Sequence, residues 1–81
     1  MKKVIRVYDW DGKFIGYAKL FYFDEDLTYE LTTDKKKATV LDFYQDGEID
    51  DYYTEIDGNE VSMNELAVEI FDCFTAIFEA V

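Results

Sequence analysis

Carboxylates are the one kind of reactive side chain that this sequence offers in number. Of its 81 residues, 19 are Asp or Glu and none is His. Without histidine, the chain lacks the commonest general base and the usual ligand of zinc and copper. Ser62 is the sole serine and stands where it would cap a helix, and Cys73 falls on the apolar side of the same helical pattern, with no cation near it to activate a thiol. Nucleophilic catalysis is therefore not predicted.

The spacing of some carboxylates approaches that of a calcium-binding loop. Asp46, Glu48 and Asp50 match positions 1, 3 and 5 of an EF-hand, but Asp51 replaces the glycine of position 6 and Asp57 the glutamate of position 12. A pair of glycosidase carboxylates would need a sugar-sized cleft, which so short a domain rarely supplies. The glycines match no phosphate-binding motif. We therefore expect no metal, no cofactor and no enzymatic activity.

The charge of the chain is divided unevenly along its length. Residues 1–41 contain all eight basic side chains and seven acidic ones, whereas residues 42–81 contain twelve acidic side chains and no basic one. Such asymmetry indicates an electrostatic partner. Nucleic acids and anionic membranes are unsuitable, because both carry the same sign of charge as the second half. The expected partner is a basic protein.

The acids of the second half could form two regular rows. If residues 46–56 are extended, alternate carboxylates lie ~6.6 Å apart, and acids one helical turn apart lie ~5–6 Å apart. This resembles the charge pattern of a nucleic-acid strand, with one charge per ~3.4 Å, and neighbouring tyrosines could anchor a contact. The candidate partner-binding residues are Asp46, Glu48, Asp50, Asp51, Tyr52, Tyr53, Glu55, Asp57, Glu60, Glu65, Glu69, Asp72 and Glu79.

The elements that would position these residues begin with strands. The segments 3–10 and 13–23, joined at Asp11-Gly12, predict a long β-hairpin with large apolar side chains on both faces, in which Gly16 marks a bulge or a close approach. Residues 27–33 alternate cleanly between apolar and polar types and predict a strand with one buried face.

The middle of the chain is less regular. Thr33 or Asp34 is predicted to cap a single helical turn, followed by a strand over 39–44, and the alternative is one helix over 34–44. A fifth strand or an irregular edge is predicted between the turn signals at Asp46-Gly47 and Asp57-Gly58.

A C-terminal helix is the most strongly patterned element. Ser62 and Glu65 form a capping box, and apolar residues recur with helical spacing from Met63 to about Ala80. The apolar arc covers about half the helix, wider than the ~100° that docking on one sheet requires. The surplus at Phe71, Phe74 and Phe78 would be covered by the second face of the hairpin or by another chain.

Together these elements predict a single α+β domain over residues 1–81. It would consist of a four- to five-stranded antiparallel sheet, opened by the N-terminal hairpin, with one C-terminal amphipathic helix packed on it. The chain has no apolar run near the ~18 residues that would span a bilayer, no signal-like leader and only one cysteine. A cytoplasmic protein that does not bind membranes is expected.

The general character of the chain resembles a known class of small proteins. Its size, its acidity, its lack of histidine and proline and the passage YELTTDKKKATVLDF are similar to inhibitors carried by bacterial phages and mobile elements. That class includes anti-CRISPR and anti-restriction proteins, several of which act as acidic mimics of DNA. The resemblance implies a stoichiometric inhibitor of a host defence protein and assigns no individual residue.

Two other interpretations remain open at this point. The acidic charge could serve solubility alone, as it does on many small proteins. Alternatively, the chain could be a small structural or assembly protein that forms a homodimer through Phe71, Phe74 and Phe78.

Overall fold

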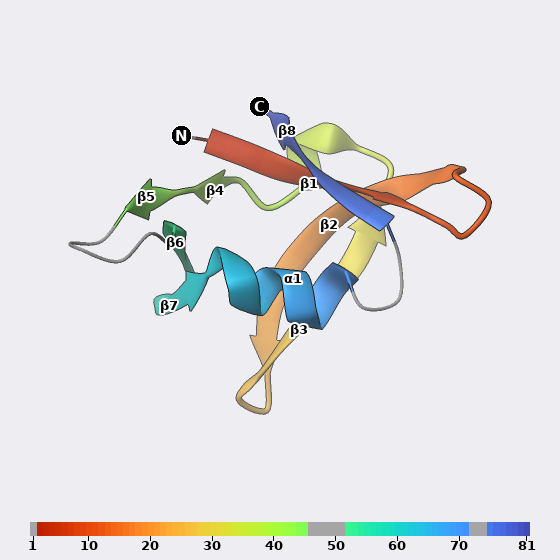
Figure 1. Ribbon diagram of the computed structural model, residues 1–81. Coiled ribbons are helices and arrows are strands. Elements are labelled where there is room, and N and C mark those ends of the chain that lie inside the picture. Colours follow the sequence, from red (N-terminus) through yellow and green to blue (C-terminus); the bar gives the residue numbers. More distant parts are fainter. Residues whose placement is uncertain (1, 46–51, 72–74) are drawn as a thin grey trace.

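The computed structural model describes residues 2–45, 52–71 and 75–81, and for 68–71 it describes the backbone alone. Within these ranges the chain is mostly antiparallel sheet with a single short helix, which confirms the α+β class (Figure 1). In chain order the elements are β1 (Lys2–Tyr8), β2 (Phe14–Phe23), β3 (Asp26–Thr32), the 3-10 turn η1 (Lys35–Lys37), β4 (Leu41–Asp42), β5 (Tyr44–Gln45), β6 (Tyr52–Ile56), β7 (Asn59–Ser62), α1 (Met63–Phe71) and β8 (Thr75–Ala80).

Strand β1 is the centre of a five-stranded sheet. Along one edge it pairs first with β4, at Lys2 and Lys3, and then with β2, from Arg6 to Tyr8. Strand β8 pairs with β1 from Lys3 to Tyr8, and β3 pairs with β2. The predicted hairpin partners do pair, but β1 is an internal strand rather than the opening edge of the sheet.

The turn between β1 and β2 is wider than predicted. Asp9 and Trp10 leave the strand, and the Asp9 carboxylate accepts hydrogen bonds from the backbone N–H groups of Asp11 at 3.0 Å and Lys13 at 2.8 Å. The expected two-residue turn at Asp11-Gly12 is therefore wrong, because the side chain of Asp9 organises a longer loop.

Gly16 lies where β2 and β3 approach closely, as expected. The register with β1 shifts next to it, and its φ of +146° is one that side-chain-bearing residues rarely adopt. A Cβ atom at this position would come within 3.1 Å of the Thr32 carbonyl oxygen. Glycine is therefore required on both conformational and steric grounds.

A second sheet contains β5, β6 and β7. The predicted strand over 39–44 is broken at the buried Phe43, so that β4 belongs to the first sheet and β5 to the second. Asp57 and Gly58 form a two-residue turn between β6 and β7, with the positive φ angles, 50° and 79°, that a type I′ turn requires. The same Asp-Gly signal in the sequence could have predicted β7, which was missed.

The helix begins where the sequence predicts and ends earlier. The Ser62 hydroxyl accepts a hydrogen bond from the backbone N–H of Glu65 at 3.1 Å, which caps α1. The predicted extension to Ala80 is wrong, because α1 ends at Phe71 and Thr75–Ala80 forms β8. Pairing with β1 satisfies the backbone groups along an edge that would otherwise be open, and this outweighs the helical periodicity.

Both sheets and the helix contribute to one apolar core. Leu41 of β4, Val61 of β7 and Leu66 of α1 are fully buried and lie in the same cluster as Ile5 and Val7 of β1. The Asp34 side chain accepts a hydrogen bond from the Lys36 N–H, which confirms the predicted capped turn at η1. In the described ranges, no helix has the length and apolar character needed to cross a membrane.

Candidate functional site

Glu79 lies in an internal ion cluster rather than on a helical stripe. It is part of β8, and its Oε1 is 2.9 Å from Arg6 Nη1 while its Oε2 is 3.0 Å from Lys35 Nζ. The hydrogen bond from Arg6, and next that from Lys35, lower the pKa of the Glu79 carboxyl below its ordinary value. The predicted position of Glu79 on a helical stripe is therefore wrong, because Glu79 belongs to β8 and its charge already meets Arg6 and Lys35. Its role in partner binding stays a prediction.

Arg6 is held by aromatic rings as well as by Glu79. Its guanidinium carbon lies 4.9 Å from the centre of the Phe14 ring, 5.6 Å from that of Tyr8 and 5.9 Å from that of Tyr17. The hydrogen bond to Glu79 raises the pKa of Arg6 above its ordinary value. Rings and carboxylate together stabilise the cation and connect β1, β2 and β8.

The phenylalanines of the predicted dimer face do not share a helix. Phe78 belongs to β8 and packs edge-on against Phe43, with ring centroids 5.3 Å apart. Phe71 is the last residue of α1, and Phe74 lies outside the described residues. A homodimer through one helical face is therefore not supported.

The acids of the second sheet are arranged quite differently from Glu79. Glu55 of β6 lies directly opposite Glu60 of β7 in the antiparallel register, with both side chains exposed. Among the described residues, no cation lies within ion-pair distance of either carboxylate. Glu60 accepts a hydrogen bond from the Tyr44 hydroxyl at 2.7 Å. Like charges placed directly opposite in a sheet repel each other.

A second acidic hairpin, β2–β3, lies beside the first, and its acids were not among the predicted binding residues. The backbone N–H of Tyr22 donates to Asp57 Oδ2 at 3.1 Å, which brings the β6–β7 turn against β2 close to the β2–β3 turn. That turn consists of Asp24 and Glu25, with Phe23 paired to Asp26. These acids escaped notice because they belong to the nearly neutral first half of the chain, and only the fold brings them near Asp57.

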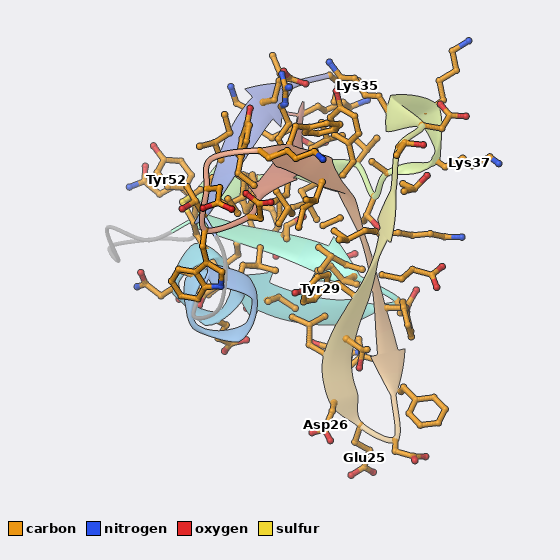
Figure 2. All side chains as sticks on the ribbon, turned by 90° about the vertical axis from the view of Figure 1, so that its right-hand side faces the viewer. Glu25, Asp26, Tyr29, Lys35, Lys37 and Tyr52 are labelled. Carbon is orange, nitrogen blue, oxygen red and sulfur yellow. The ribbon has the colours of Figure 1, made fainter. Side chains whose placement is uncertain are left out.

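The two hairpins form what we call the acidic surface, which consists of Asp24, Glu25, Asp26, Glu55, Asp57 and Glu60. Its tip is far from the lysines of η1, because Glu25 and Asp26 lie at one end of the molecule and Lys35 and Lys37 at the other (Figure 2). Acidic and basic groups are thus separated in space even though Glu25, Asp26, Lys35 and Lys37 all belong to the first half of the sequence.

The remaining predicted acids are less informative. Glu65 lies in the first turn of α1, where a carboxylate is favoured by the helix dipole. The side chain of Glu69 is not described. Asp46, Glu48, Asp50, Asp51 and Asp72 lie outside the described residues.

Tyrosines lie beside the acids of the second sheet. Tyr52 is 40% exposed and Tyr53 is half-buried. Tyr44, which was not among the candidate binding residues, is also 40% exposed, and its ring lies 6.4 Å from that of Tyr53. Each of these rings has an apolar body beside acidic groups, a combination suited to cationic side chains.

Val40 lines two hollows. The smaller, about 260 Å³, is lined by Val40, Asp42, Tyr44, Thr54 and Glu55. The larger, about 540 Å³, is lined by Val4, Asp34, Lys35, Lys36, Val40 and Val81. The first therefore has an acidic and aromatic lining, and the second has lysines beside valines. In the described part of the chain, no three potential metal ligands come together.

No protein family, curated protein or solved structure matches this chain.

Proposed function

We propose that this chain is a non-enzymatic acidic binding protein, a stoichiometric inhibitor that occupies the basic nucleic-acid-binding surface of a host defence protein. The observation that carries the proposal is the Glu55–Glu60 pair. Two exposed carboxylates lie directly opposite each other, with no cation beside them among the described residues.

The cost of this pair supports a role beyond solubility. Like charges opposite each other in a sheet cost roughly 0.2–1 kcal/mol, and lysine at either position would replace repulsion with attraction. The chain has eight basic residues and uses two of them on Glu79 alone. A charge that serves only solubility could lie anywhere on the surface. Two acids directly opposite each other, Glu55 and Glu60, are better explained by a ligand that contacts both carboxylates.

The β2–β3 turn supports the same conclusion. Asp24 and Glu25 have φ angles of 49° and 68°, a conformation that glycine and asparagine adopt more readily than glutamate. Left-handed backbone costs a residue with a side chain roughly 1–2 kcal/mol. Strain retained at an exposed acidic tip is consistent with selection for the carboxylates themselves.

Binding would follow from charge complementarity. A protein that grips nucleic-acid phosphates has arginines and lysines on its surface, and the acidic surface would attract these cations from a distance. Association would be fast and would weaken as salt is added. Tyr44 and Tyr52 would then provide apolar contact area at the edge of the charged region. The inhibitor would act in the cytoplasm of the bacterial host cell.

The proposal is tested by capture and competition. The immobilised full chain is exposed to bacterial lysate at low and at high salt, and the bound proteins are identified. We expect a nucleic-acid-binding protein that is retained only at low salt, and we expect duplex DNA and the chain to compete for it when it is purified.

Matched charge reversals separate the acidic surface from acidity in general. Glu55→Lys combined with Glu60→Lys should abolish capture. The control variant combines Asp11→Lys, in the β1–β2 loop, with Glu30→Lys, opposite Lys19 on β3. It changes the net charge by the same amount outside the acidic surface and should retain most of the capture. Capture that survives the first pair, or that both pairs reduce equally, contradicts the proposal.

A further inference from the structure

The smaller hollow beside Val40 has a composition that suits one kind of side chain. Its walls combine a valine, a tyrosine ring and two carboxylates, those of Asp42 and Glu55. At about 260 Å³ it is below the ~300–1,000 Å³ that is usual for small-molecule pockets. It is therefore suited to a single long side chain rather than to a metabolite.

The floor of this hollow adds an uncharged acceptor. Thr54 lines the hollow although it is only 1% exposed. Its hydroxyl oxygen is able to accept a hydrogen bond from a ligand that carries N–H groups.

The charge of the hollow selects a cation. Asp42 lies opposite Lys2 of β1 in the antiparallel register. Glu55 has no ion pair among the described residues, and Glu60 beside it adds negative charge. A cationic side chain with several donors could contact Glu55, the Thr54 hydroxyl and the Tyr44 ring together.

The fold already contains an arginine in similar surroundings. Arg6 is bound by the Glu79 carboxylate and lies over aromatic rings, with its guanidinium carbon 4.9 Å from the nearest ring centre. A guanidinium is planar, stacks on rings and presents five donors, whereas an ammonium is a compact, strongly hydrated charge. The ring and carboxylates around the hollow offer the same combination to an arginine of another protein.

We infer that the hollow lined by Val40, Asp42, Tyr44, Thr54 and Glu55 is the binding site for one arginine side chain of the partner protein. This deepens the proposed function, on which it rests for the source of the arginine. The guanidinium contacts Glu55 and Thr54 and stacks on Tyr44, while its aliphatic stem packs against Val40.

The experiment uses a defined probe, the acetylated and amidated peptide Gly-Gly-Arg-Gly-Gly, titrated into the isotope-labelled full chain and followed by NMR. We expect saturable shifts at Val40, Tyr44 and Thr54. A citrulline peptide, similar in shape but uncharged, should cause none, and a lysine peptide should bind several-fold more weakly. Equal binding of lysine overturns the choice of arginine, and saturable binding of citrulline overturns the site.

Variants give the matched comparison. Glu55→Gln and Tyr44→Leu should each weaken binding about tenfold, since a charge-assisted hydrogen bond or a stacked ring is lost. Glu65→Gln makes the same charge change on α1 and should stay within about twofold, because screened distant charges contribute little. Tyr44→Phe keeps the aromatic ring and should bind the arginine peptide as tightly as the wild type does. Equal weakening by Glu55→Gln and Glu65→Gln overturns the inference.

The two proposals fail in different ways. Arginine peptide binding in the hollow, without capture of any nucleic-acid-binding protein, contradicts the proposed function and supports the site. Full capture by a chain carrying Glu55→Gln and Tyr44→Leu overturns the site and leaves the proposed function standing.

Discussion

Glu79 and Glu55 are both exposed or partly exposed carboxylates on strands of one small protein, yet their surroundings are opposite. Glu79 has a guanidinium at 2.9 Å and an ammonium at 3.0 Å, with aromatic rings around the guanidinium. Glu55 lies opposite another glutamate. The chain therefore has the means to neutralise an acid on a strand and, among the residues that the structure describes, does so in one sheet only.

The difference follows from how the pairing of each two strands is determined. Strands β1 and β8 are distant in sequence, so the ion cluster helps to select β8 as the partner of β1. Strands β6 and β7 are joined by the Asp57-Gly58 turn, which fixes their register without help from side chains. Ile56 and Val61 anchor that hairpin in the core, so the repulsion between Glu55 and Glu60 is tolerated.

The largest effect is expected at the neutralised acid. Arg6→Leu should destabilise the protein substantially, because it removes one of the two counter-ions of Glu79 and also the cation held by three rings. Urea unfolding followed by circular dichroism measures the loss. Lys19→Leu removes an exposed ion pair at 3.8 Å and should change stability by no more than about 0.5 kcal/mol. Equal losses would show that the cluster has no special role.

The pH dependence of the free energy of unfolding should show the contribution of the Glu79 carboxylate. Because the pKa of Glu79 is lowered in the folded protein, its contribution is present above the unfolded pKa, whose ordinary value is 4.5, and is lost as pH falls through the folded value. The stability difference between the wild type and Glu79→Gln should therefore shrink below about pH 4.5. Unfolding curves from pH 7 to pH 3 measure it. A difference that stays constant with pH contradicts the assignment.

An opposite result is expected in the second sheet. Glu55→Lys should stabilise the protein by about 0.5–1 kcal/mol, because it replaces repulsion across the β6–β7 pair with attraction. The same variant should lose partner binding. Glu65→Lys puts an equal charge change at the start of α1, where it opposes the helix dipole and should destabilise slightly. Stabilisation by both variants would point to net charge alone.

The smallest effect is expected at the β2–β3 turn. Glu25→Gly should stabilise the protein by about 0.5 kcal/mol, since relief of the left-handed backbone exceeds the entropy that glycine loses. Asp26→Gly removes the same charge from the first residue of β3, and should be neutral or destabilising. Thermal unfolding compares the two. Stabilisation by both would assign the gain to charge rather than to strain.

Local features of the fold could be predicted from the sequence. The cap at Ser62, the capped turn at Asp34 and the close approach at Gly16 each depend on a few neighbouring residues, and all three are present. The end of α1 could not be predicted in this way. The residues after Phe71 continue an apolar periodicity without glycine or proline, and only the open edge of β1 decides that Thr75–Ala80 becomes a strand.

The sequence predicted the negative charge of the candidate site but not its geometry. The acidity of the second half indicated a basic partner, but the composition could not show that Glu79 is neutralised or that Asp24 and Glu25 lie beside Asp57. One signal was available for Glu79. Arg6 stands between the apolar residues Ile5 and Val7, and a half-buried guanidinium requires a carboxylate from elsewhere in the chain.

The pairing of β1 with β8 also has a consequence for biosynthesis. Arg6 and Glu79 are 73 positions apart, so β1 leaves the ribosome well before its partner has been made. Contacts so distant in sequence slow folding, and at roughly 5–20 residues per second several seconds separate the two strands. During that interval the unpaired edge of β1 could pair with other nascent chains. Arrival of β8 closes this edge, which makes it the strand that ends the period of greatest aggregation risk.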